Sequence, residues 1–348
     1  MEIAVREINS KRLSSGEEFL TLLVSYPKSW FAPVKLSPFS FSIENETISW
    51  MSKLKLIKNK KKLKQILDME PRHYAGYTHS MAAYEHALMY CKYITMWLLW
   101  DDDCIEIAED VNQIANPLLA LAGESTDYEE NIGYHEAFLH IGNEYERLGA
   151  SKNWRKRFSE KMLEWAKYAI QEEKIRKNIT HHSFEDALKL RSFTVGIRPN
   201  TLPLERAVGI EIPDEILIDP EYEELLDNAA RICCIVNDIV SVPKDLNNKQ
   251  IYSNLVLYHK HLNKISLNDS FYALIKIHDY SVLRFDSLAK SLLNKVKNAF
   301  YERLNTYLYH LRYMDSGFGF WHQDCARYQN LVAIENGIAY RLSITLKL

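Results

Sequence analysis

Acidic side chains gather at one point of the sequence, where an apolar stretch ends. The segment 97–106 reads Trp-Leu-Leu-Trp-Asp-Asp-Asp-Cys-Ile-Glu. In a helix, Asp101 and Asp102 lie three and four residues after Leu98, so they continue the apolar face that contains Ile94 and Leu98. Carboxylates in a partly buried place repel one another and lose hydration unless they are protonated, paired with bases or bound to a hard cation. Magnesium suits such a cluster, because it takes oxygen ligands from one or two carboxylates and from substrate phosphates.

A second row of oxygen-bearing side chains lies far along the chain. Asn237, Ser241 and Asp245 are four residues apart, which places them on one face of a helix. An amide, a hydroxyl and a carboxylate together offer oxygen ligands to a hard cation, and Lys244 could bind an anion. Pro243 lacks a backbone donor and disfavours helix at the residue before it, so we expect a kink there.

Each of the two segments also has an ordinary explanation. The acidic cluster could be a helix C-terminus in water, although negative charge is unfavourable at that end of a helix. The second row could be a helix end with polar capping residues. From the residues of each segment alone, the metal site and the ordinary explanation both stay open, and the ordinary one is slightly favoured for the second row.

Together, the two segments resemble the metal-binding motifs of class I terpene synthases, particularly the microbial and slime-mould members. The segment 101–106 fits the longer form of the aspartate-rich motif DDxx(x)D/E, and 237–245 fits the second motif, NDxxSxxxD/E, at every fixed position. The resemblance implies Mg²⁺, with Mn²⁺ as an alternative, and it implies the metal ligands Asp101, Asp102, Glu106, Asn237, Ser241 and Asp245. A shorter register that starts at Asp102 also fits the first motif, so the choice among Asp101, Asp102 and Asp103 stays open. We favour Asp101 and Asp102 because they continue the inward face.

Two further positions agree with this family. Its diphosphate-sensing arginine lies about 46 residues before the second motif, and Arg191 lies 46 residues before Asn237. The family also has an Arg-Tyr pair about 80 residues after that motif, which matches Arg327 and Tyr328. The resemblance therefore covers roughly residues 80–330. It implies that the diphosphate oxygens are held by Arg191, Lys244, Arg327 and Tyr328.

The resemblance implies a terpene synthase reaction, that is, a carbon–oxygen lyase acting on a prenyl diphosphate. Farnesyl diphosphate is the expected substrate, and a carbocation would be cyclised or rearranged after diphosphate leaves. Trp97, Phe193 and Trp321 lie near the motifs and are candidates to line the cavity, while residues 194–196 would transmit closure to the substrate. The alternatives are a diterpene synthase that uses geranylgeranyl diphosphate, and a non-catalytic helical scaffold or inactive relative. A chain-elongating prenyl synthase would need a second aspartate-rich motif in place of 237–245.

Helices must position these groups. Apolar residues recur at helical spacing over 81–100, and 221–242 also has a helical pattern. A further apolar stripe runs from Leu288 to Leu311 until 315–317 interrupts it. Because no segment shows a convincing alternating pattern, we expect an all-α, single-domain fold, and the resemblance implies a helical bundle around a deep apolar pocket. Residues 1–45 are expected to form an irregular N-terminal arm that could cap the site, and residues 46–348 the catalytic domain.

Composition narrows the function further. The chain has 348 residues, of which only 11 are glycine, and it contains neither GxGxxG nor GxxxxGK[ST], so a glycine-loop phosphate site is excluded. A net charge of −3 argues against nucleic acid as a partner. The longest apolar runs are too short to span a bilayer, no signal-peptide pattern opens the chain, and the five cysteines suit a reducing compartment. We therefore expect a cytoplasmic monomer or homodimer.

Overall fold

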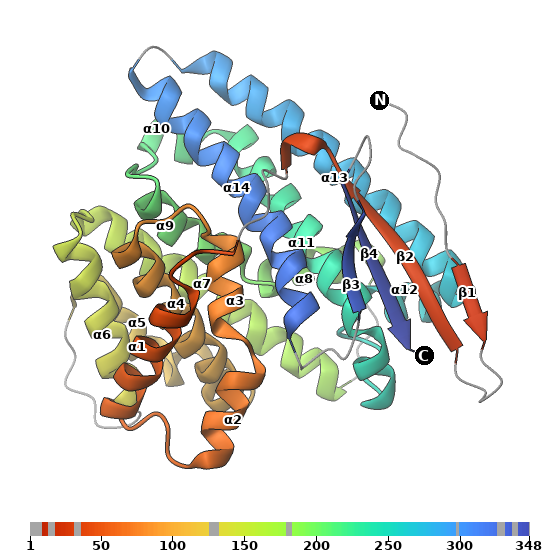
Figure 1. The fold of residues 1–348 in the computed structure, drawn as a ribbon, viewed down its shortest axis with the longest axis horizontal. Helices are drawn as coiled ribbons and strands as arrows, with labels where there is room; N and C mark the ends of the chain where they lie inside the picture. The colour runs from red at the N-terminus through yellow and green to blue at the C-terminus, as the bar shows by residue number, and fades with distance from the viewer. Residues whose placement is uncertain are drawn as a thin grey trace.

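A body of α-helices carries a small sheet at one side (Figure 1). The computed structural model describes residues 9–12, 18–30, 36–124, 132–178, 183–296, 299–325, 331–335 and 340–347. The α-helices are α1 (Ser40–Lys53), α2 (Lys60–Asp68), α3 (Pro71–Thr78), α4 (Tyr84–Trp100), α5 (Ala115–Ala122), α6 (Ile132–Arg147), α7 (Lys152–Asn178), α8 (Phe184–Thr194), α9 (Ile197–Ala207), α10 (Asp214–Leu217), α11 (Pro220–Asn247), α12 (Leu255–Asn263), α13 (Leu267–Lys295) and α14 (Ala299–Asp324). Single turns of other helix types are η1 (Lys28–Trp30), η2 (Asp101–Ile105) and η3 (Val111–Gln113).

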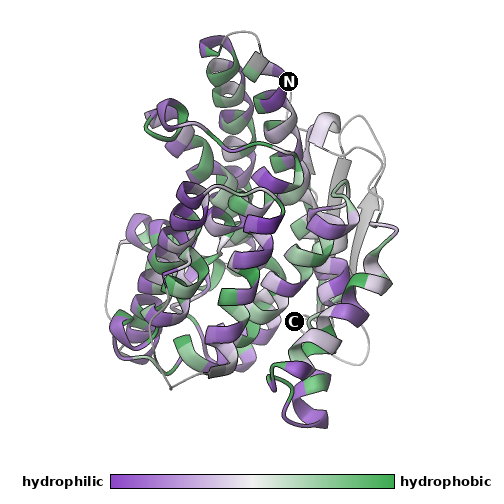
Figure 2. Cartoon of the chain, turned by 90° about the vertical axis from the view of Figure 1, so that its left-hand side faces the viewer, coloured by the Kyte–Doolittle hydropathy of each residue, from purple (hydrophilic) through white to green (hydrophobic). Residues whose placement is uncertain are grey.

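Helix α11 is central to the body and carries the second motif. It packs against α8, α9, α12, α13 and α14, and its apolar face includes Ile232, Ile235 and Ile239, all fully buried. Coloured by hydropathy, the helices carry hydrophobic and hydrophilic residues in alternation along their length (Figure 2). The helical body that the sequence predicts is therefore confirmed, including helices over most of 81–100 and 221–242.

Local signals explain where the site-bearing helices begin. Helix α8 starts with a capping box, in which the Ser183 hydroxyl accepts from the backbone N–H of Asp186 and the Asp186 carboxylate accepts from that of Ser183. Helix α11 starts with Pro220 at its first position after the capping side chain of Asp219. Contrary to expectation, α11 continues through Pro243 to Asn247, so Asp245 stays on the helix.

The apolar stripe 288–311 belongs to two helices rather than one. Helix α13 ends at Lys295, and Val296 has extended backbone angles. Helix α14 then runs through 315–317, where the sequence predicts an interruption. The glycine there serves close packing, because a Cβ at Gly317 would lie 2.6 Å from the carbonyl oxygen of Tyr77 on α3.

Four strands at the two ends of the chain were not expected from the sequence. They are β1 (Asn9–Arg12), β2 (Glu18–Tyr26), β3 (Leu331–Glu335) and β4 (Tyr340–Lys347), and they form an antiparallel sheet in the order β1-β2-β4-β3. Leu20 pairs with Leu346 and Leu22 with Ile344; all four side chains are buried. The sheet packs against α11, α13 and α14. The all-α fold class is confirmed for the body of the protein, and the sheet at the chain ends is an addition that the sequence did not predict.

The predicted division at residue 45 can be compared with the elements only in part. The segment 1–45 is not wholly irregular, because it contains β1, β2 and η1, and α1 already begins at Ser40. Within the described part of 1–45, no residue lines the cavity described below. A capping role for this arm stays a prediction. Among the helices of the described residues, none has an apolar stretch long enough to cross a membrane.

A buried carboxyl group on α9 gives the fold a pH dependence. Glu205 is 1% exposed and accepts from the Arg157 guanidinium and, at 3.1 Å, from the backbone N–H of Ile212. Burial raises the pKa of Glu205 from its ordinary 4.5 to about 7, against the opposing effect of those two partners. The folded state therefore binds a proton at Glu205 between pH 4.5 and 7 that the unfolded state releases.

We expect the free energy of unfolding to fall as pH rises from about 4.5 to 7, by at most about 3 kcal/mol from this group. The variant Glu205→Gln should flatten that part of the profile, because it cannot titrate. Urea unfolding at half-unit pH intervals measures the slope. Glu160→Gln, at an exposed ion pair of α7, serves as the control. This variant should keep the wild-type slope of unfolding free energy against pH. An unchanged slope in Glu205→Gln would contradict the assignment.

Candidate functional site

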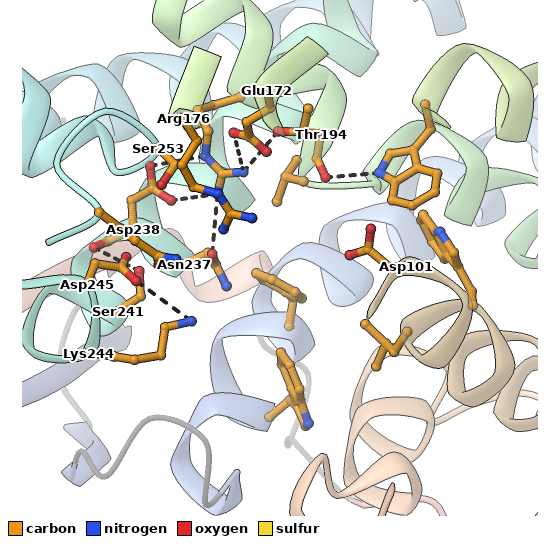
Figure 3. A pocket seen from close by; sticks show the side chains of 18 of the residues that line it. Asp101, Glu172, Arg176, Thr194, Asn237, Asp238, Ser241, Lys244, Asp245 and Ser253 are labelled. Carbon is orange, nitrogen blue, oxygen red and sulfur yellow. Dashed lines mark hydrogen bonds and ion pairs between the residues drawn. The ribbon is translucent and has the colours of Figure 1, made fainter. Parts of the chain in front are cut away.

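One row of side chains on α11 faces a cavity. Asn237, Ser241, Lys244 and Asp245 all line it, and Asp101 faces them from the opposite side (Figure 3). The cavity has a volume of about 210 Å³ and is open to solvent. Asp238, the neighbour of Asn237, also lines it. The helical spacing that the sequence predicts for the second motif therefore brings its oxygen atoms to one place.

The aspartate-rich segment forms a π-helical turn, η2, directly after α4. The backbone N–H of Glu106 donates to the carbonyl oxygen of Asp101 at 3.1 Å, five residues back. A π turn holds more residues than an α turn, and such turns are frequent at functional sites. It also rotates the later aspartates away from the face that α-helical spacing would predict.

The three consecutive aspartates consequently have different surroundings. Asp101 lines the cavity. Asp102 accepts from Nε2 of Gln65 on α2 at 2.6 Å. Asp103 pairs with Nζ of Lys62 at 2.6 Å and accepts from the hydroxyl of Tyr134 at 2.7 Å. Asp102 is not among the residues that line the cavity, so only one of the two aspartates favoured from the sequence lies there.

Arg191 on α8 reaches the same cavity and is held by acidic side chains. Its guanidinium contacts both carboxylate oxygens of Asp238, at 2.6 and 3.3 Å, and Oε1 of Glu172 at 3.3 Å. It also donates to the hydroxyl of Thr194 at 2.9 Å and to Oδ1 of Asn237 at 3.3 Å. Burial alone would lower the pKa of Arg191, but Asp238 and Glu172 outweigh burial and raise it well above its usual value.

Burial and the Arg191 guanidinium have opposite effects on the pKa of each acidic partner. Burial raises the pKa of Asp238 and of Glu172, while the Arg191 guanidinium counteracts it in both. The bidentate geometry at Asp238 is that of an ionised carboxylate. An anion that displaced these carboxylates would find a pre-placed planar fork of donors.

Several cavity residues were not predicted from the sequence. Glu172 and Arg176 come from α7, and Arg176 pairs with Glu173. In the amide orientation that satisfies both of its ends, Gln250 accepts from Arg176 at 3.1 Å and donates to Oδ1 of Asp245 at 3.2 Å. Arg176 thus adds a second arginine on the same side as Arg191. A charged residue in the last turn of a long polar helix gives no signal of this kind in the sequence.

Aromatic and aliphatic side chains form another wall of the cavity; its members are Tyr74, Ile94, Trp97, Leu98, Trp165, Val195, Phe318 and Trp321. Trp97 and Trp165 meet edge to face, with ring centroids 4.8 Å apart, and Tyr74 meets Trp321 in the same way at 4.6 Å. The predictions for Trp97 and Trp321 as lining residues are therefore confirmed. Phe193 does not line the cavity, because it stacks on Tyr168 at 4.0 Å.

Arg191 lies one turn before a break between two helices. Helix α8 ends at Thr194, Gly196 has a φ of 80°, and α9 begins at Ile197. A side chain at Gly196 would clash with the ring of Trp97. The carbonyl oxygen of Thr194, at this break, accepts from the indole N–H of Trp165 at 3.0 Å. Thr194, at the break, therefore contacts both Arg191 and Trp165 of the aromatic wall.

The sequence-predicted residues can now be placed. Six lie at the cavity: Asp101, Arg191, Asn237, Ser241, Lys244 and Asp245. Asp102 and Glu106 do not line it, and Glu106 is exposed at the end of η2. Arg327 and Tyr328 lie outside the described residues. Roles of all ten in metal or diphosphate binding stay predictions. The deep apolar pocket that we expected is therefore partly polar, because charged side chains such as Asp101, Arg191 and Asp245 also line it.

The donor atoms at the cavity suit a hard cation. Asp245 and Asp101 offer carboxylates, Ser241 a hydroxyl and Asn237 an amide oxygen, all oxygen ligands of the kind that magnesium takes. Among the described residues, no sulfur or imidazole group lines the cavity. In the part of the chain that the structure describes, no three His, Cys, Asp or Glu side chains come together in a way that could hold a metal ion.

Comparison with known proteins identifies relatives. Residues 92–284 match the family model described as terpene synthase family 2, C-terminal metal binding. Terpene synthase 1 of Dictyostelium purpureum is 24% identical over 243 residues, which are 68% of this chain and 64% of that protein. A (−)-β-caryophyllene synthase of Saccharothrix espanaensis, named as cyclising (2E,6E)-farnesyl diphosphate, is 31% identical over 116 residues, 32% of each chain.

The fold has solved counterparts. The structure of hedycaryol synthase in complex with nerolidol superposes with a TM-score of 0.70 over 83% of this chain and 96% of that one, at 16% identity. At this identity the likeness concerns the fold, and it covers most of the helical body.

Proposed function

This chain belongs to the class I terpene synthases, and we propose that it is a magnesium-dependent sesquiterpene synthase. In the proposed reaction, the allylic carbon–oxygen bond of farnesyl diphosphate ionises and diphosphate is released. The carbocation is then cyclised or rearranged, and it becomes a neutral terpene hydrocarbon by losing a proton or a terpene alcohol by adding water and losing a proton.

The observation that carries the proposal is the meeting of three kinds of group at one cavity. Oxygen ligands come from α11 and from Asp101, cationic donors come from Arg191, Arg176 and Lys244, and aromatic rings form another wall. Such a division suits a substrate with an anionic head and an apolar tail. A non-catalytic scaffold would have no reason to keep charged and aromatic groups together in this way.

The cationic side chains would bind and orient the diphosphate. Arg191 presents a planar fork that matches two phosphate oxygens, and its carboxylate partners keep it in place before substrate arrives. Lys244 lies 3.7 Å from Asp245, so it supplies a further positive charge beside the α11 row. Arg327 and Tyr328 are additional candidates for this task.

Charge neutralisation of the leaving diphosphate is the chemistry that bound magnesium supplies. The residues that would hold the metal are Asp101 on one side and Asn237, Ser241 and Asp245 on the other. Asp102 and Glu106 are proposed as further ligands on the strength of the motif alone.

The aromatic wall would protect the cation. Water quenches carbocations, so the hydrocarbon part of the site must exclude it. The faces of Trp97, Trp165 and Trp321 can stabilise positive charge by about 0.5–2 kcal/mol each. The hydrogen bond from Trp165 to Thr194 fixes one of these rings relative to Arg191.

One observation supports farnesyl over geranylgeranyl diphosphate. The Saccharothrix relative is named for cyclising farnesyl diphosphate.

A substrate panel tests this choice. Purified protein is incubated with magnesium and geranyl, farnesyl or geranylgeranyl diphosphate, and kcat/KM is measured for each from extracted products. We expect farnesyl diphosphate to exceed geranylgeranyl diphosphate by about tenfold or more, in line with the few kcal/mol by which pockets discriminate chain length. A preference for geranylgeranyl diphosphate would contradict the substrate assignment but not the family.

A further inference from the structure

Asn254 is a fully buried polar residue between the α11 row and α12. It is the N-cap of α12, and its Oδ1 accepts from the backbone N–H groups of Val256 and Leu257, at 3.0 and 3.2 Å. Its side chain is 0% exposed. Capping a helix requires only the oxygen of this amide, so the nitrogen end is free to serve another purpose.

The nitrogen of Asn254 points at two of the α11 side chains. Nδ2 lies 2.9 Å from Oδ2 of Asp245 and 3.1 Å from Oγ of Ser241. It also lies 2.8 Å from the carbonyl oxygen of Asp238. One amide therefore holds a hydroxyl and a carboxylate that are four residues apart on the cavity face.

These hydrogen bonds leave ligand capacity on both partners. A serine oxygen has two lone pairs, and a carboxylate has about four acceptor positions. The bond to Asn254 uses one of them on Ser241 and one on Oδ2 of Asp245. Gln250 donates to Oδ1 of Asp245, and Lys244 pairs with the same oxygen. The positions that are left on Ser241 and Asp245 can meet a cation in the cavity, while rotation of both side chains away from it is restrained.

Leu255, the residue after Asn254, contacts the carboxylate that holds Arg191. The backbone N–H of Leu255 donates to Oδ2 of Asp238 at 2.8 Å, and Asp238 holds Arg191. The first turn of α12 thus contacts the metal-side groups through Asn254 and the arginine side through Leu255. Two parts of the site that lie far apart in sequence share one rigid support.

We propose that Asn254 is a positioning residue that pre-sets Ser241 and Asp245 for magnesium binding. This inference rests on the proposed function, since it assumes that the α11 row receives the metal. Partners of this kind typically change metal affinity by 10- to 100-fold when removed. Asn254 positions the two side chains through its Nδ2 donors, and this role can be separated by substitution from the capping of α12 by its Oδ1.

Two substitutions separate the donors from the cap. Asn254→Asp and Asn254→Ser both keep an oxygen that can cap α12. Aspartate lacks the amide donors and adds a charge, whereas serine lacks them without adding one and is too short to bridge both side chains. Asn263→Asp is the matched control, because it makes the same chemical change at the exposed far end of α12.

The test is calorimetric binding of inorganic diphosphate at increasing magnesium chloride, with the melting temperature measured in the absence of metal. We expect the half-saturating magnesium concentration to rise about tenfold or more in both Asn254 variants and to stay unchanged in Asn263→Asp. The melting temperature of Asn254→Ser should fall by only a few degrees. A merely structural role would lower the melting temperature without moving the magnesium dependence.

The outcomes are distinguishable. If both Asn254 variants bind diphosphate at the wild-type magnesium concentration, the positioning role is overturned while the proposed function stands. If the wild-type protein itself binds no diphosphate with magnesium, the proposed function is wrong, and this inference, which rests on it, is wrong as well.

Discussion

Replacing Asp101 by asparagine should lower kcat/KM for farnesyl diphosphate by at least about 100-fold, whereas Asp103→Asn should leave it within about threefold. The two residues are separated by one position, but only Asp101 lines the cavity. Asp103 is 37% exposed and pairs with Lys62 on α2. Exposed pairs of this kind contribute little.

Asp101 and Asp103 are matched controls for one another. They undergo the same chemical change within one π turn, so a general loss of helix stability would affect both variants alike. Steady-state kinetics with farnesyl diphosphate and saturating magnesium measures the difference. If Asp103→Asn proved as damaging as Asp101→Asn, the cavity geometry would not explain the motif.

The variant Arg191→Lys should lower kcat/KM by about 100-fold although it preserves the positive charge. Lysine cannot reproduce the planar fork that now contacts both oxygens of Asp238 and that we assign to the diphosphate. It also loses the bond to Thr194, which joins the arginine to the helix break and, through Trp165, to the aromatic wall.

A matched arginine outside the site provides the control. Arg284 on α13 holds both oxygens of Glu224 on α11, at 2.6 and 2.7 Å, in the same bidentate manner. Arg284→Lys should keep kcat/KM within about twofold, because exposed ion pairs contribute little. Equal losses in the two variants would indicate that helix packing, rather than diphosphate binding, explains the effect.

The second motif could be predicted from the sequence because its oxygen-bearing residues are spaced by about one turn of the helix that carries them. Asn237, Ser241 and Asp245 follow the α-helical repeat, and α11 keeps that repeat through Pro243. The first motif was predicted less completely. Its residues adopt a π turn, which single-sequence periodicity does not indicate, so extrapolation from Leu98 placed Asp101 correctly but not Asp102.

The strands were missed for a different physical reason. Strand β2 does alternate, with Leu20, Leu22 and Val24 buried, but Leu23 between them is also apolar and hides the period of two. Its main partner β4 lies more than 300 residues away, and pairing at that separation leaves no local signal. The apolar stripe 288–311 misled in the opposite sense, because its period continues across the break between α13 and α14.

Buried partners of the site were also invisible from the sequence. Glu172, Arg176 and Asn254 reach the site from α7 and α12, and their contacts depend on how helices pack rather than on spacing along the chain. Arg191 was found only through its distance to the second motif. The sequence thus predicted the groups that follow one helix and missed those that tertiary packing supplies.

The most direct test of the central claim is one incubation of the purified protein with farnesyl diphosphate. With magnesium, we expect gas chromatography and mass spectrometry to show a sesquiterpene hydrocarbon or alcohol, and one equivalent of inorganic diphosphate to be released for each substrate consumed. Chelation of the metal with EDTA should abolish both signals. Recovery of unchanged farnesyl diphosphate in the presence of magnesium, or equal product formation with EDTA, would contradict the account.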